Sequence, residues 1–126
     1  MEEHSFIFDD VFDENVTNQE LYVNAVQSLI ESALKGTRVT CFAYGQTGSG
    51  KTYTMMGMQK GDKLIPGLFL LATEDIFLKI REVIIKKRNL QFKVWVSFYE
   101  IYSGKLYDLL NNRNILFARE DGKQVI

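Results

Sequence analysis

Gly45-Gln46-Thr47-Gly48-Ser49-Gly50-Lys51-Thr52 is the stretch that decides the fold. It satisfies the phosphate-loop pattern G-x-x-x-x-G-K-[ST]. Residues 38–44, which precede it, are mostly β-branched or apolar without alternation, and this predicts a central strand covered on both faces. A helix is expected to begin near Lys51, so the loop stands in the strand-loop-helix order that confirms the motif.

The spacing of this motif has a physical reason. Its glycines let the backbone curl, so that N–H groups point inward and meet phosphate oxygens with no Cβ in the way. Lys51 can extend its ammonium to the β- and γ-phosphates, and Thr52 offers a hydroxyl to the Mg²⁺ that bridges them. The positive end of the following helix adds to the attraction. We therefore predict ATP or ADP with Mg²⁺ as ligands, and Thr52 as the metal-facing residue.

The patterns on either side of the loop predict an α/β domain. Thr17 and Glu20 form a capping box, and apolar residues then recur at helical spacing until Gly36. Residues 91–102 alternate, which predicts a long strand with one buried face. The other expected elements are a strand at 6–8, a loop at 58–67, a helix at 68–83, a helical turn at 105–110, and a hairpin pairing 115–117 with 125–126.

Composition excludes several classes of function. The 126 residues are 46% hydrophobic and 25% charged, as in one ordinary globular domain. The 15 basic and 16 acidic residues leave a net charge of -1, so no broad positive field attracts nucleic acid or an anionic membrane. No apolar run approaches the roughly 20 residues of a membrane span. Cys41, the only cysteine, lies in an apolar run and is interpreted as a buried thiol in a cytosolic protein.

The residues around the loop narrow the class further. Residues 42–55, FAYGQTGSGKTYTM, resemble the kinesin phosphate-loop signature along their whole length. Residues 6–12, FIFDDVF, are similar to the kinesin strand before the first core helix, and residues 96–102, VSFYEIY, to the strand after the second. Residues 103–111 and 119–124 are most similar to the microtubule-depolymerising kinesin-thirteen family.

This resemblance implies a P-loop three-layer α/β fold, with a mostly central sheet and helices on both faces, of which residues 1–126 form a truncated, partial motor domain. It implies ATP hydrolysis coupled to action on microtubules, tubulin as the partner, and a location on the cytoskeleton, at microtubules or the spindle. In kinesins the residue matching Tyr53 packs beside the adenine, where an aromatic face can stack. The predicted nucleotide-binding residues are Gln46, Thr47, Gly48, Ser49, Gly50, Lys51, Thr52 and Tyr53.

Other parts of a P-loop ATPase are not recognisable in these residues. The kinesin switch strings N-x-x-S-S-R-S-H and D-L-A-G-S-E, which would hold Mg²⁺ and orient the attacking water, do not occur, and neither does the adenine-binding R-x-R-P strand. Asp9 is interpreted as a turn residue and Glu100 as a buried, hydrogen-bonded carboxylate. We therefore assign no catalytic residue, and expect the switch regions and the tubulin-binding helices outside residues 1–126.

Two other functions remain as alternatives. A non-motor P-loop ATPase can carry a similar loop, although residues 42–44 and 53–55 favour kinesin. A non-catalytic interaction module that keeps only the fold would not bind nucleotide. The sequence does not indicate an oligomeric state, a direction of movement or a cargo.

Overall fold

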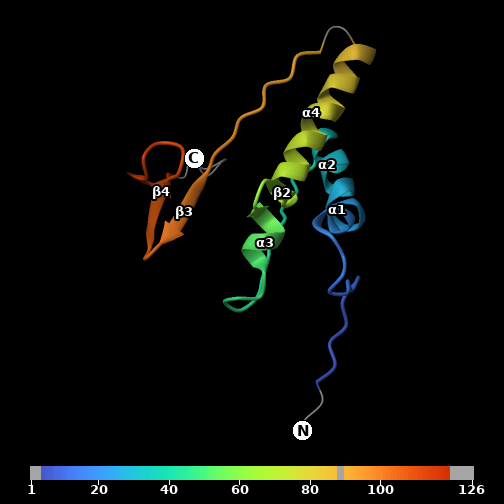
Figure 1. Ribbon diagram of the computed structural model, residues 1–126. Coiled ribbons are helices and arrows are strands. Elements are labelled where there is room, and N and C mark those ends of the chain that lie inside the picture. The colour runs from blue at the N-terminus through green and yellow to red at the C-terminus, as the bar shows by residue number, and fades with distance from the viewer. Residues whose placement is uncertain (1–3, 88–89, 120–126) are drawn as a thin grey trace. The chain divides into compact units, whose positions relative to one another are not determined.

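The computed structural model describes residues 4–87 and 90–119 (Figure 1). The chain divides into two compact units, Met1–Leu90 and Gln91–Ile126. The first unit contains the described helices, a β-hairpin and the phosphate loop. The second contains a three-stranded antiparallel sheet.

The helix predicted after Thr17 is confirmed. It consists of α1 (Asn18–Leu21), a π-helical turn η1 (Tyr22–Val26) and α2 (Gln27–Leu34). The capping box is formed as expected: Thr17 Oγ1 accepts from the Glu20 amide at 3.2 Å, and Glu20 Oε2 accepts from the Thr17 amide at 2.8 Å. Hydrogen bonds from Thr17 lower the pKa of the Glu20 carboxyl. The start of the helix is therefore fixed by its own first turn.

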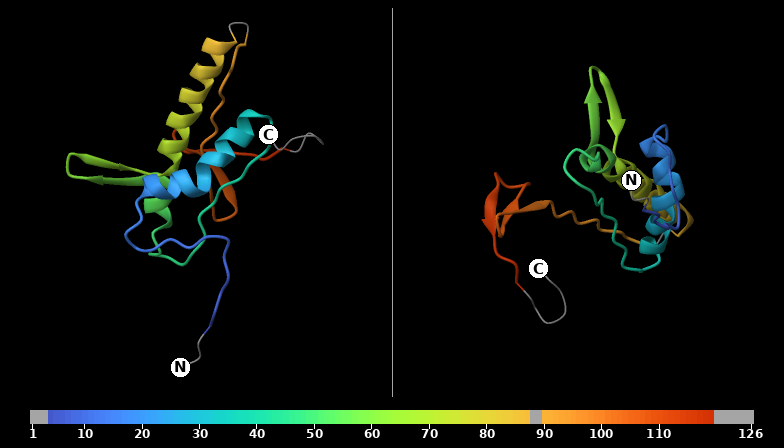
Figure 2. Two further views of the ribbon diagram at one scale, coloured as in Figure 1. Left: turned by 90° about the vertical axis from the view of Figure 1, so that its right-hand side faces the viewer. Right: turned by 90° about the horizontal axis from the view of Figure 1, so that it is seen from below.

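The phosphate loop leads into α3 (Lys51–Met56), and a hairpin of β1 (Gly57–Lys60) and β2 (Lys63–Pro66) connects α3 to the long helix α4 (Leu68–Lys86). The loop expected at 58–67 is therefore a paired hairpin, which projects away from the helices in Figure 2. A two-residue turn closes it, and Gly61 at its first position has a φ of 59°, which glycine adopts without strain.

The core of the first unit lies where the helical segment from α1 to α2 packs against α4, as the ribbon shows (Figure 1). Its buried members come from both sides of this contact: Tyr22, Val26, Ile30, Leu68 and Leu71. Met55 of α3 packs against the same cluster. Burial of apolar surface thus joins the helix that follows the phosphate loop to the other helices.

A polar network borders this core. The Tyr22 hydroxyl donates to Asp75 Oδ2 at 2.7 Å, and Lys79 Nζ lies 3.9 Å from Asp75 Oδ1 and 3.1 Å from Glu31 Oε1. Burial, followed by the hydrogen bond to Asp75, raises the pKa of the Tyr22 hydroxyl well above its ordinary value. The hydrogen bond to Glu31 is the main reason that the pKa of Lys79 is also raised. The network links η1, α2 and α4.

Tyr22 gives the stability a dependence on alkaline pH. Because its pKa is higher in the folded state, its contribution is complete below the unfolded value of about 10 and is lost as the pH rises above it. We expect Tyr22→Phe to cost about 1 kcal/mol near neutral pH and to flatten the fall in unfolding free energy above about pH 10. Urea titrations at each pH measure this. The exposed Tyr44→Phe is the control, and parallel slopes for wild type and Tyr22→Phe would contradict the expectation.

The second unit is a meander of β3 (Tyr99–Tyr102), β4 (Lys105–Asp108) and β5 (Asn114–Leu116). Ser103 and Gly104 join β3 to β4 with φ values of 50° and 75°, the two left-handed residues of a tight hairpin turn. The helical turn predicted at 105–110 is therefore wrong, because this turn reverses the chain and Lys105–Asp108 pairs with β3.

Two segments expected to be strands, 6–8 and 38–44, carry no strand in the structure, and of the strand expected over 91–102 only β3, Tyr99–Tyr102, is formed. A strand needs a hydrogen-bonded neighbour, and the described residues pair only within the two small sheets. Phe42 and Tyr44 are 77% and 95% exposed, and Cys41 is exposed, so the prediction of a buried thiol is wrong for the same reason. The second strand of the hairpin expected at 125–126 lies outside the described residues.

Candidate functional site: the phosphate loop

The backbone of the phosphate loop explains its glycines. The Ser49 amide donates to the Gln46 carbonyl at 3.2 Å, which closes a turn whose third residue, Gly48, has a φ of 82°. Gly50, the N-cap of α3, has a φ of 89°. Residues that carry a Cβ rarely adopt such φ values, so glycine is required at both positions. The loop is therefore a hydrogen-bonded backbone turn that leads directly into Lys51, the first residue of α3.

Lys51 folds back over the loop that it follows. Its Nζ atom donates to the carbonyl oxygens of Gly45 and Gln46, each at 2.7 Å. An ammonium has three donors. Two of them bond to these carbonyl oxygens and so stabilise the bend of the loop, and the third is not used by these bonds.

A hollow of about 370 Å³ lies on this loop and the first turn of α3. Its lining consists of Thr47, Gly48, Gly50, Lys51, Thr52 and Tyr53. The structure therefore brings together six of the eight residues that the sequence predicts for nucleotide binding. Gln46 and Ser49 are outside the lining, where they form the turn beneath it.

The electrostatics of the hollow favour an anion. Lys51 is the one charged residue among its lining residues, and the glycines leave the backbone uncovered. The dipole of α3 adds less than the sequence suggested, because this helix has only 6 residues. The positive charge of Lys51 is thus the main feature of the hollow that would attract an anion.

Thr52 offers a hydroxyl beside Lys51, exposed on the hollow. Among residues 4–87 and 90–119, no three acidic, histidine or cysteine side chains gather as a metal site. Mg²⁺ keeps several waters and often binds through one or two protein oxygens together with substrate phosphates. A single hydroxyl therefore fits Mg²⁺ only when the phosphates of a nucleotide supply other ligands.

Asn18, which the sequence analysis did not single out, holds the helix that follows the loop. Its side chain is buried, and Nδ2 donates to the carbonyl oxygens of Tyr53 and Pro66, each at 3.0 Å. A signal was available in the sequence: Asn18 stands one helical turn before Tyr22, in line with the apolar stripe of α1 and α2. A polar residue at that position needs partners inside the protein.

The two carboxylates considered for chemistry lie outside this hollow. Asp9 is exposed in a segment without strand structure. Glu100 accepts from Arg113, whose guanidinium also lies 5.0 Å from the ring centre of Tyr107. The hydrogen-bonded carboxylate predicted at Glu100 is confirmed, although its side chain is 36% exposed rather than buried.

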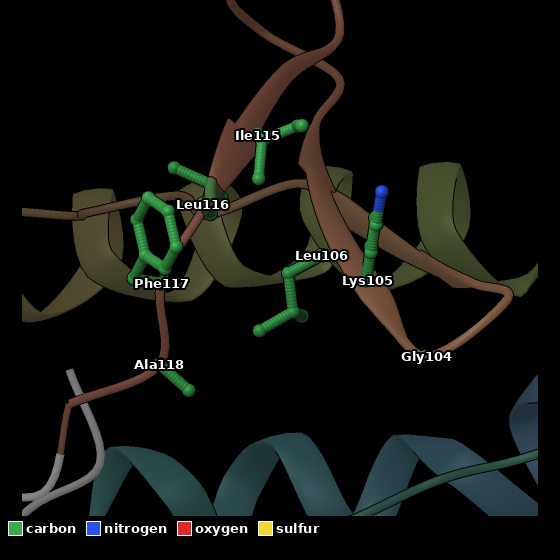
Figure 3. A pocket seen from close by; sticks show the side chains of 7 residues that line it. All are labelled: Gly104, Lys105, Leu106, Ile115, Leu116, Phe117 and Ala118. Carbon is green, nitrogen blue, oxygen red and sulfur yellow. The ribbon is translucent and has the colours of Figure 1, made fainter.

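A second hollow, of about 500 Å³, lies in the three-stranded sheet (Figure 3). Its lining consists of Gly104, Lys105, Leu106, Ile115, Leu116, Phe117 and Ala118. Lys105 is the one charged residue among them, and most of the others are apolar. This hollow lacks a glycine-rich turn like that of residues 45–50, so size alone does not make it the better anion site.

A glycine-rich loop of this sequence, followed by a lysine and a threonine at the start of a helix, defines the class of P-loop proteins. Comparison with known proteins identifies the family within this class: the chain matches the kinesin motor domain over residues 1–126 and belongs to that family. The resemblance seen in residues 6–12, 42–55 and 96–102 is thus confirmed.

Several relatives are similar over nearly the whole chain. Mouse kinesin-like protein KIF24 is 52% identical over 124 residues, which are 98% of this chain and 9% of that protein. Rice kinesin-like protein KIN-13A is 44% identical over 126 residues, 100% of this chain and 14% of that protein. Arabidopsis KIN-13B is 47% identical over the same length. The similarity to the kinesin-thirteen family is thus confirmed by two relatives that carry its name.

A solved structure supports the α/β fold. Drosophila NOD, in the nucleotide-free complex with the microtubule and bovine tubulin, matches with a TM-score of 0.76 and 32% identity over 88% of this chain and 39% of that chain. The chain thus spans a small part of the relatives it matches. Within the described residues, no helix has the length and apolar character needed to cross a membrane.

Proposed function

We propose that residues 1–126 are the ATP-binding part of a kinesin motor domain and bind Mg-ATP or Mg-ADP at the phosphate loop. The proposal rests mainly on Lys51, which lines the hollow together with two glycines. Its ammonium donates to the carbonyl oxygens of Gly45 and Gln46, and these two bonds leave its third N–H donor for a phosphate oxygen. Glycine at 48 and 50 keeps this hollow open to phosphate oxygens. Thr52 supplies an oxygen for the metal, and Tyr53 a ring for the base.

Calorimetric titration of Mg-ADP into the full chain tests this function. We expect saturable binding with one site. Absence of binding would favour a non-catalytic interaction module. A non-motor P-loop ATPase is disfavoured, because the chain belongs to the kinesin motor domain family over residues 1–126.

We further propose that the full protein couples ATP hydrolysis to action on microtubules, as a motor or a depolymerase, and resides on the microtubule cytoskeleton or spindle. The support is the match to NOD, a structure of which is a complex with the microtubule, and to relatives named as kinesins. Tubulin is then the protein partner. Phosphate release by the full protein, measured with and without microtubules, tests the coupling.

Thr52→Ala should reduce the gain in nucleotide affinity that Mg²⁺ provides, because it removes a metal-facing hydroxyl and leaves the loop backbone intact. We expect the Mg²⁺ enhancement of ATP affinity to fall about tenfold, and Thr52→Ser to be mild. ATP titrations with and without Mg²⁺ in the three proteins measure this. Equal enhancement in wild type and Thr52→Ala would refute the metal role.

A further inference from the structure

Asn18 joins three elements of the first unit at one point. It begins α1, and its amide reaches Tyr53 of α3 and Pro66 of β2, which are 35 and 48 positions away in the chain. Its exposed fraction is 5%, and it is the one polar or charged residue that is buried in the described part of the chain. A polar group is placed there at the cost of its hydration, so its bonds must compensate.

The orientation of this amide is fixed by its neighbours. Both partners are backbone carbonyl oxygens, which only accept hydrogen bonds. The NH₂ end of Asn18 must therefore face them, since the carbonyl end would meet two oxygens. Each of its two hydrogens has one acceptor, at 3.0 Å, so the donor capacity of the amide is fully used.

The Tyr53 carbonyl is also the acceptor for the Gly57 amide that ends α3. In a six-residue helix such a carbonyl belongs to the last turn, where helix carbonyls lack partners within the helix. Asn18 and Gly57 thus fix the backbone of Tyr53 from two sides. The side chain of the same residue, 39% exposed, lines the hollow next to Thr52.

We propose that Asn18 is a positioning residue for the nucleotide pocket, which sets the ring of Tyr53 for the base without affecting the phosphate loop itself. This inference rests on the proposed function. The phosphate end of the pocket is built by residues 45–52, whose turn and lysine contacts are made within the loop. Asn18 contacts none of them by hydrogen bond. Removing the Asn18 amide should therefore weaken the binding of the adenosine part of a nucleotide and not that of its phosphates.

The test compares two ligands that share a phosphate pair: Mg-ADP and Mg-pyrophosphate, which lacks adenosine. Asn18→Asp keeps the shape of the side chain and replaces the donor with an acceptor. We expect ADP affinity to fall about tenfold, and pyrophosphate affinity to change less than about twofold. Tyr53→Ala should give the same selective loss. The matched control is Asn24→Asp, because Asn24 makes only a local bond to the Glu20 carbonyl on the exposed side of the same helix.

The outcomes separate the inference from the function on which it rests. Equal losses for both ligands, or no loss of ADP affinity, would overturn the positioning role while the proposed function stands. If wild type binds neither ligand, the proposed function fails and the inference with it. Should Asn18→Asp not fold, Asn18→Ser keeps one donor and is judged by the same ratio of ADP to pyrophosphate affinity.

Discussion

Gly67→Ala should lower the free energy of unfolding by about 3 kcal/mol, at the upper end of the usual cost of overpacking. A Cβ on Gly67 would lie 2.3 Å from the Gly57 nitrogen, 2.4 Å from the Met56 carbonyl carbon and 2.5 Å from the Met55 carbonyl oxygen. All three are backbone atoms, which cannot turn aside as the end of a flexible side chain can. The end of α3 and the start of α4 would have to separate, and the Met55 contact with the core would be loosened.

Urea unfolding of wild type and variant measures this effect. Gly61→Ala is the contrasting control: Gly61 has a φ of 59° and open space around its missing Cβ, whereas Gly67 has a φ of -92°, which any residue can adopt, and backbone atoms in the place of its Cβ. The control therefore reports backbone strain without a clash, which is worth about 1–2 kcal/mol. If Gly67→Ala unfolded at the same urea concentration as wild type, the close approach of these backbones would be wrong.

Local signals in the sequence predicted the helices of the first unit well. The capping box of Thr17 and Glu20 and the apolar spacing after it placed the first helix, because both act within a few residues of the chain. The phosphate loop was also predictable, since its pattern names the turn glycines, the lysine and the threonine that line the hollow. These features need no information about distant residues.

The sheets were predicted less well, because a strand depends on its neighbour. Residues 38–44 have strand-like composition, yet the described residues offer them no hydrogen-bonded partner. Residues 105–108 were expected to be helical, and instead pair with β3 across a two-residue turn. Ser103 at that turn has a φ of 50°, uncommon for a residue other than glycine, so the turn was hard to recognise.

Long-range hydrogen bonds explain what the sequence analysis missed at the site. Asn18 matters through two carbonyl oxygens, and backbone carbonyls carry no sequence signature. The Lys51 ammonium likewise donates to backbone carbonyl oxygens, those of Gly45 and Gln46, inside the motif itself. The motif therefore predicted residues that line the hollow, and the structure adds the contacts that hold them in place.

Lys51→Ala should weaken nucleotide binding by about 1.5 to 3 kcal/mol, roughly ten- to hundredfold, the usual worth of hydrogen bonds to charged groups. Two effects combine in this variant. It removes the charge that attracts the phosphates, and it frees the Gly45 and Gln46 carbonyls, so that the loop loses the contacts that hold its curl. Lys51→Met would not separate these two effects, because methionine lacks both the positive charge and the hydrogen-bond donors. Lys51→Arg keeps the charge and changes the geometry of the donors.

Calorimetric titration of Mg-ADP into wild type and Lys51→Ala measures the loss. Lys60→Ala, at an exposed position of β1, is the matched control for removing one positive charge from the same unit. We expect the control to keep wild-type affinity, because a distant exposed charge is screened by salt. Pyrophosphate affinity should fall as much as ADP affinity in Lys51→Ala, since the ammonium serves the phosphates, and this distinguishes Lys51 from Asn18. Unchanged ADP affinity in Lys51→Ala would show that the ammonium stays on the loop carbonyls and does not bind phosphate.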